Sequence, residues 1–293
     1  MCIGLFTIVP LRLLLLTLTV SFGGIFILFF HSINFRHLSQ WTLRIVCRLM
    51  LFCFGFISIE VIGRVPFPCP PIVVSNHIST IEILHLATIL NTPAFVTKSA
   101  VFNIPIIGRV ARDILQCIGV DRTGTTNTTE RITQRIRSAK AVATIPTIPL
   151  VIFPEGTTSN GTQLLSFKKG AFVSRQPVLP IVYSFPRSGS FIPTYESIMT
   201  PIYVWRIMSQ PWNNLQCKIL DPISPDRNDQ TIAEYAVQVR NVMAKSLDVD
   251  VIDMDYSDKL KYHDQLRAAY SAHPRGGLWA MCFDPMLCDD KNK

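Results

Sequence analysis

The strongest constraint on this sequence is an uncharged apolar run near its start, from Leu13 to Phe30. As a helix, a run of this length reaches about 27 Å, close to the hydrocarbon thickness of a bilayer. Only Arg12 precedes it, and it ends in phenylalanines without the small residues of a signal-peptidase site. A retained membrane anchor is therefore predicted, with a cleaved signal peptide or a buried or interfacial helix as the alternatives.

A second apolar stretch spans residues 43–62, but charges interrupt it. Its longest uncharged part is too short to cross a bilayer, so an in-plane helix or a re-entrant hairpin with the first segment is predicted. Arg36, Arg44 and Arg48 all follow the first segment. Because positive residues favour the cytoplasmic side of a membrane, the bulk of the chain is expected in the cytosol.

The composition limits the functional classes. Of the 293 residues, 48% are hydrophobic and 16% are charged, which excludes a disordered or coiled-coil protein. Residues 1–175 hold 16 Lys and Arg against 6 Asp and Glu, whereas the remainder holds 12 against 14. This basic first half indicates an anionic partner, either membrane lipid or nucleic acid. The eight cysteines include no C-x-x-C pair, so free thiols are expected instead of a zinc site or a disulfide framework.

Strand and helix patterns alternate after a proline-rich break at residues 66–71, and they predict an α/β domain over residues 65–255. Residues 1–64 are the predicted anchor, and residues 256–293 a polar, weakly patterned tail. Strands are expected at residues 72–74, 94–97, 150–153, 178–183 and 215–220. Helices are expected at residues 81–90, 103–118, 129–140 and 231–246, the last with a capping box of Thr231 and Glu234.

The first motif that suits catalysis is Asn76–Glu82, where a strand runs into a helix. A histidine titrates near neutral pH and suits general-base work, and a carboxylate can fix its tautomer. His77 and Glu82 meet only if His77 lies in the loop and Glu82 in the first helical turn. Because Ser79 and Glu82 also have capping-box spacing, Glu82 is predicted either to orient His77 or to bind backbone N–H groups. His85, in an apolar helix, is expected to be a core residue.

Three further segments accompany this motif. Phe153–Thr162 is a loop after a strand, rich in glycine and hydroxyl groups, which can cradle a phosphate or an oxyanion or be an ordinary polar loop. Arg122 follows a short strand and suits a phosphate, although an ion pair with Asp121 explains it equally well. Val178–Val182, around Pro180, is by itself a core strand.

Together and in this order, the four segments resemble the blocks of the glycerolipid acyltransferase superfamily. His77 and Glu82 match its H-x4-D block, and residues 153–157 match its F-P-E-G-T block, which is quite specific. Arg122 and the strand with Pro180 match its second and fourth blocks. Four segments look like the lysophosphatidylcholine and lysophosphatidylethanolamine acyltransferase branch, namely 157–161, 167–172, 210–212 and 221–247.

The resemblance implies a mixed α/β sheet flanked by helices and an acyl-CoA:lysophospholipid O-acyltransferase. His77 would take the proton from the free glycerol hydroxyl, the oxygen would attack the thioester directly, and Glu82 would orient His77. Arg122 and the loop at residues 155–157 would hold the acceptor phosphate. The implied substrate-binding set is Asn76, Ser79, Arg122, Glu155, Gly156, Thr157, Lys168 and Pro180.

One departure is Glu82, because the family block usually ends in Asp, and it leaves open a slower enzyme or a changed acceptor. The alternatives are acylation of lysophosphatidic acid or glycerol 3-phosphate, a serine hydrolase using Ser79 or Ser159, and a non-catalytic membrane scaffold. Neither serine lies in G-x-S-x-G, which disfavours the hydrolase. The sequence has no EF-hand pattern, so calcium control is not suggested.

The expected partners are membrane lipid, a lysophospholipid and acyl-CoA as co-substrate, with no metal, no other cofactor and no nucleic acid. The expected location is a membrane, that of the endoplasmic reticulum, with the catalytic domain facing the cytosol. Asn127 and Asn160 begin glycosylation sequons, which this orientation predicts to be unmodified. The basic helix at residues 129–140 either meets CoA phosphates or anionic lipid or is a solvated face.

Overall fold

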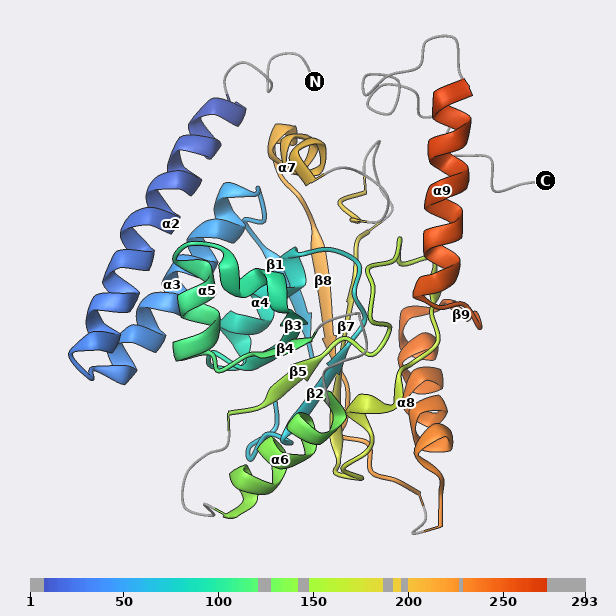
Figure 1. Cartoon of the computed structure of the whole chain (residues 1–293). Coiled ribbons are helices and arrows are strands. Elements are labelled where there is room, and N and C mark those ends of the chain that lie inside the picture. Colours follow the sequence, from blue (N-terminus) through green and yellow to red (C-terminus); the bar gives the residue numbers. More distant parts are fainter. Residues whose placement is uncertain are drawn as a thin grey trace.

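A mixed sheet of seven strands runs through the protein, with helices on both of its faces (Figure 1). The computed structural model describes residues 8–120, 128–141, 148–186, 192–195, 200–226 and 229–272. The seven strands are β1 (Ile59–Ile62), β2 (Ile72–Ser75), β3 (Ala94–Lys98), β4 (Ile118–Val120), β5 (Leu150–Ile152), β7 (Val178–Ser184) and β8 (Leu215–Ile219). Their order is β1-β8-β7-β2-β5-β3-β4, and only β7 and β8 pair antiparallel. The mixed sheet that the resemblance implied is confirmed.

Successive residues of the buried strands enter opposite layers. The main helices are α2 (Ile8–Ser32), α3 (Arg36–Cys53), α4 (Ile81–Ile89), α6 (Thr128–Ala141), α7 (Thr200–Ser209), α8 (Ile232–Leu247) and α9 (Tyr256–Ala272). Val73 of β2 belongs to a core cluster with residues of α3, α4 and α7, whereas Ile72 and Val74 belong to a second cluster with residues of α6 and α8. Because both faces of the sheet are covered, β2 has a continuous apolar sequence without alternation.

Most of the predicted elements are confirmed near their expected bounds, including β2, β3, β5, β7, β8, α4, α6 and α8. The capping box of α8 is complete: the Thr231 hydroxyl accepts from the Glu234 N–H, and the Glu234 carboxylate accepts from the Thr231 N–H. Residues 103–118 do not form the predicted helix. They contain only the one-turn α5 (Ile107–Arg109) and the π-turn η2 (Val110–Ile114), after the 3₁₀ turn η1 (Ser99–Asn103).

The helical hairpin of α2 and α3 packs against one side of the α/β unit (Figure 1). By length and composition, α2 is able to cross a bilayer. Its Arg12 nevertheless donates hydrogen bonds to the carbonyl oxygens of Met208 (2.8 Å), Gln210 and Pro211 (2.6 Å), at and after the end of α7. The first turns of α2 are therefore attached to the α/β unit.

Two predicted segments differ from the structure. Of the two alternatives for the second apolar stretch, a single in-plane helix is wrong, because α3 ends at Cys53 and residues 59–62 form β1, which pairs with β8 at the sheet edge. Its first part, within α3, does form a hairpin with the first segment. The sheet therefore begins before residue 64, where the domain boundary was predicted. The predicted tail contains the helix α9. Just before α9, the short strand β9 (Asp250–Val251) pairs parallel with β6 (Gln163–Leu164), which belongs to the loop after β5.

The strand order brings the predicted motifs to one place. β2 and β5 are adjacent and parallel, with Val74 opposite Ile152. Because the carboxyl ends of parallel strands lie at the same edge of a sheet, His77 after β2 and the loop after β5 emerge side by side. The helix α4 begins at this edge and carries Glu82 in its first turn.

Candidate active site

Asn76 fixes the point at which the chain leaves β2. Its side-chain amide donates to the carbonyl oxygen of Tyr183 and its Oδ1 accepts from the N–H of Tyr183, both at 2.8 Å. Asn76 is 2% exposed. The side chain thus joins the ends of β2 and β7, and this burial leaves the amide no open face for the substrate contact that was expected of it.

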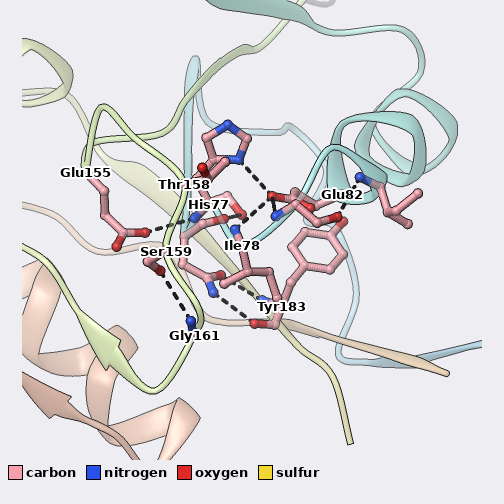
Figure 2. Close-up of polar contacts among 12 residues, drawn as sticks. His77, Ile78, Glu82, Glu155, Thr158, Ser159, Gly161 and Tyr183 are labelled. Atoms are coloured by element: carbon pink, nitrogen blue, oxygen red, sulfur yellow. Dashed lines mark hydrogen bonds and ion pairs between the residues drawn. The ribbon is translucent and has the colours of Figure 1, made fainter. Parts of the chain in front are cut away.

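Glu82 makes the contacts of both predicted roles with a single oxygen atom. Its Oε1 lies 2.8 Å from His77 Nδ1 and accepts hydrogen bonds from the N–H groups of Ile78 (2.9 Å) and Ser79 (2.8 Å). Figure 2 shows this convergence on Oε1, at the start of α4. Glu82 is fully buried, and its Oε2 has no hydrogen-bond partner among the described residues.

These contacts define the tautomer of His77. Because Oε1 already acts as an acceptor for two N–H groups, Nδ1 carries the proton that lies toward Glu82, and Nε2 is left with a free lone pair. Figure 2 shows Nε2 on the far side of the ring from Glu82. The ring stacks on Phe153, with centroids 4.2 Å apart, and 18% of the side chain is exposed. His77 is thus held rigidly while one edge of its ring stays accessible.

Glu155 holds the backbone of the same histidine from the opposite side (Figure 2). Its Oε1 accepts from the N–H of His77 at 2.8 Å, and its Oε2 from the N–H of Leu165 at 3.3 Å. Burial, and to a smaller degree the charge of Glu82, raises the pKa of Glu155 to about 7. Glu155 is 1% exposed. Glu155 therefore lies where it positions His77. The predicted phosphate contact would require it to face solvent, which it does not.

The loop after Glu155 turns back over the site. Gly156 has a φ of 68°, a conformation that favours glycine. A Cβ there would lie 2.9 Å from both Cε and Nζ of Lys168, so the exposed Lys168 side chain covers the loop. Thr157 is 6% exposed, and the N–H of Ser159 donates to the carbonyl oxygen of His77 at 2.8 Å. Of the predicted substrate-binding residues that the structure describes, Lys168 is the one with an exposed positive charge.

Two of the remaining predicted contacts, Ser79 and Pro180, are buried. Ser79 is fully buried, and its Oγ accepts from the N–H of Ile81 at 2.8 Å. Pro180 is a buried residue of β7 opposite Val74 of β2, so it lies in the centre of the sheet. Arg122 lies outside the described residues.

Lys259 is a contact of the site that sequence reasoning missed. It belongs to α9, within the predicted tail, and its Nζ donates to the carbonyl oxygen (2.5 Å) and hydroxyl (3.2 Å) of Thr158. Its charge lowers the pKa of Glu155, opposing the larger effect of burial. Because about a hundred residues separate Lys259 from Thr158, no local pattern could have indicated this contact.

His85 is the core residue that was predicted. It is 1% exposed, its Nδ1 lies 2.8 Å from the hydroxyl of Tyr183, and burial together with the charge of Arg48 lowers its pKa to about 4. Over the described part of the chain, no three His, Cys, Asp or Glu side chains are grouped as metal ligands. His77 thus differs from His85 in having an accessible edge and a carboxylate partner.

Residues 58–184 match the family model described as Acyltransferase. Lysophospholipid acyltransferase LPEAT1 of Arabidopsis thaliana is 32% identical over 208 residues, which cover 69% of this chain and 51% of that protein. Lysophosphatidylcholine acyltransferase 1 of Rattus norvegicus is 30% identical over 227 residues, covering 76% and 42%. The chain spans about half the length of the curated relatives it matches.

A solved structure shares the fold. It is that of the 1-acyl-sn-glycerophosphate (LPA) acyltransferase PlsC from Thermotoga maritima. The TM-score is 0.63 at 20% identity, over 84% of this chain and 95% of that one. At this identity the likeness concerns the fold, and it confirms the predicted architecture.

Proposed function

Because residues 58–184 form an acyltransferase-family domain, we propose that the protein transfers an acyl group from acyl-CoA to the free hydroxyl of a lysophospholipid. The relatives named for lysophospholipid and lysophosphatidylcholine acylation support this acceptor class. The observation that carries the proposal is the 2.8 Å contact between His77 Nδ1 and Glu82 Oε1, since it leaves Nε2 free to accept a proton.

In the proposed reaction, Nε2 of His77 takes the proton of the acceptor hydroxyl as its oxygen attacks the thioester carbonyl carbon. A carbon–oxygen bond forms, the carbon–sulfur bond breaks, and the CoA thiolate leaves with the proton from His77. No covalent acyl-enzyme is formed. Proton transfer by a positioned histidine typically accelerates such a step by about 10²–10⁴.

The two buried carboxylates divide the positioning of His77. Glu82 holds the imidazole through Nδ1 and stabilises the imidazolium that forms during attack. Glu155 holds the backbone of His77, so that the ring lies at a fixed place beside the loop. The stacking on Phe153 restricts the remaining rotation of the ring.

The first motif has few N–H groups left for the oxyanion. Those of His77, Ile78 and Ser79 already donate to carboxylate oxygens, and that of Ile81 donates to Ser79. The N–H of Gly156 also donates, to the carbonyl oxygen of Phe153 at 3.0 Å. Stabilisation of the thioester oxyanion is therefore assigned to the N–H groups that follow it in the loop, those of Thr157 and Thr158. Lys168 beside Gly156, with Arg122, is the proposed contact for the phosphate of the acceptor.

The alternatives differ in support. Acylation of lysophosphatidic acid or glycerol 3-phosphate needs only another acceptor at the same site, and the solved neighbour is named for the former. A serine hydrolase needs a reactive hydroxyl, but Ser79 is fully buried and bonded to Ile81, and Ser159 is 6% exposed. The geometry therefore favours acyl transfer by His77 over a serine nucleophile.

The test is acyl transfer by the purified protein from labelled acyl-CoA to a panel of acceptors. The panel holds lysophosphatidylcholine, lysophosphatidylethanolamine, lysophosphatidic acid and glycerol 3-phosphate. Transfer to a choline or ethanolamine lysolipid is expected. Transfer only to lysophosphatidic acid or glycerol 3-phosphate would move the acceptor to the alternative class, and no transfer to any acceptor would favour a scaffold.

The proposed location is the membrane of the endoplasmic reticulum, with the α/β unit in the cytosol. The apolar helix α2 supports membrane attachment. The sequon at Asn160 lies in the loop that covers the site, where a glycan would block it. No endoglycosidase-sensitive change in mass is expected for the protein isolated from cells, and such a change would contradict this orientation.

A further inference from the structure

The helix α2 turns into α3 at an elbow on the left of Figure 1. An open depression of about 1040 Å³ lies at this elbow. It is lined by side chains from residues 34–44 and by Asn91, which follows α4; these residues are called the elbow pocket below. Glu82 lies in the first turn of α4, whereas Asn91 follows the last turn of the same helix. At about 1.5 Å per helical residue, that separation is about 13 Å, so the elbow pocket is distinct from the site around His77.

The elbow pocket carries positive charge without a counter-charge. Arg36, His37 and Arg44 line it, and none of the described residues lining it is acidic. Neither arginine forms an ion pair with a described residue. The Nε of Arg44 is buried and has no hydrogen-bond partner among the described residues. A buried donor without a partner is costly, so an acceptor that reaches the Arg44 guanidinium lowers the free energy of the bound protein.

The backbone adds to this preference. The helix α3 begins at Arg36, and Phe35 at its N-cap provides no side-chain acceptor. The first N–H groups of a helix carry partial positive charge and favour an anion when no cap is present. They therefore act in the same direction as the two arginines.

The rim of the elbow pocket is apolar and exposed. Trp41 is 54% exposed and Phe35 is 61% exposed. On α2, the large side chains of Phe22, Phe26 and Phe29 are more than half exposed. Tryptophan beside arginine, next to an apolar helix face, is typical of the level of lipid headgroups in a bilayer. A soluble phosphate would contact the arginines but has no apolar part to bury against this rim.

We propose that the elbow pocket binds an anionic membrane phospholipid, with Arg36, His37 and Arg44 donating to its phosphate and Trp41 lying against its chains. This lipid is neither acceptor nor donor in acyl transfer. It attaches the hairpin of α2 and α3 to a negatively charged membrane surface, which attracts basic side chains. The proposal does not depend on the proposed function, since it concerns another part of the molecule.

The test is direct binding of lipid to the purified full-length protein in non-ionic detergent, without acyl-CoA. The probes are phosphatidylglycerol with one fluorescent acyl chain and phosphatidylcholine with the same chains. Phosphatidylglycerol is expected to bind at least about tenfold more tightly, because charge-assisted hydrogen bonds are the strong ones. Equal binding of the two lipids would overturn the proposal.

Variants locate the binding. The double change Arg36→Gln with Arg44→Gln is expected to raise the Kd for phosphatidylglycerol by about tenfold or more. The matched control is Arg64→Gln, which removes the same charge from an exposed residue after β1 and is expected to leave the Kd within about twofold. If the double variant unfolds, Arg36→Gln alone, at an exposed position, is expected to raise the Kd about threefold. An unchanged Kd in a folded variant would overturn the proposal.

Competition separates a lipid from a soluble phosphate. Excess unlabelled phosphatidylglycerol is expected to displace the probe, whereas glycerol 3-phosphate at the same concentration is expected to leave it bound. Displacement by glycerol 3-phosphate as effective as that by the lipid would assign the pocket to a soluble phosphate and overturn the lipid assignment.

Discussion

The turn at residues 76–82 and the loop at residues 153–168 hold the same histidine in different ways. The turn holds the imidazole through Glu82, which is five residues from His77 in the sequence. The loop holds the backbone of His77 through Glu155, which is 78 residues away. Both carboxylates are buried and each binds N–H groups. The local contact therefore fixes the tautomer and charge stabilisation of the ring, whereas the distant contact fixes the position of its backbone.

Among changes to the groups that position His77, the largest effect is expected from Glu82→Gln. The amide keeps an oxygen for the N–H groups of Ile78 and Ser79 but has no charge to stabilise the imidazolium. We expect kcat to fall by about 10² or more with a small change in stability. Steady-state acyl transfer measures kcat, and thermal unfolding checks the fold. Retention of more than about a tenth of the activity would mean that Glu82 is mainly a helix cap.

Glu82→Asp refines the same comparison. The structure has three donors around Oε1 at 2.8–2.9 Å from a glutamate. Because the aspartate arm is shorter by one methylene, it cannot reach all three donors without a movement of the turn. We expect activity to fall by about tenfold, although Asp is the usual residue of the family block. Equal or higher activity would show that the longer arm of Glu82 is a disadvantage.

Glu155→Gln is expected to have an intermediate effect, because it acts on the position of His77 and not on its charge. Activity should fall by about tenfold or less. Stability gives a second readout: the pKa of Glu155 is about 7, against an ordinary value of 4.5. Between these pH values the unfolded chain loses a proton that the native protein keeps, so the free energy of unfolding falls as pH rises. This fall should be smaller in Glu155→Gln, and an identical pH dependence would contradict the assignment.

The smallest effect is expected from Lys259→Met, which removes the contact of α9 with the loop. Without its bonds to Thr158, the loop is held less firmly, and we expect activity to fall about threefold. The matched control is Lys261→Met on the same helix, where Lys261 is 74% exposed and pairs only weakly with Asp258. A loss of activity as large as that of Glu155→Gln would place α9 in the catalytic unit itself.

The distinction between local and distant contacts of His77 also explains which parts of the site could be predicted from the sequence. The turn was predictable because its partners lie within six residues, although the two roles of Glu82 could not be separated until one oxygen was seen to make both contacts. The role of Glu155 could not be predicted, since the direction of its side chain depends on the adjacency of β2 and β5. The contact of Lys259 and the pairing of β1 likewise depend on segments more than a hundred residues apart.

The proposed reaction depends most on His77 as the proton acceptor, and one measurement tests this role directly. Acyl transfer from labelled acyl-CoA to the best lysolipid is measured for His77→Ala, with Ser79→Ala and Ser159→Ala as controls for a serine nucleophile. We predict a loss of about 10²–10⁴ for His77→Ala and retained activity in both serine variants of unchanged fold. Transfer that survives His77→Ala would contradict the mechanism.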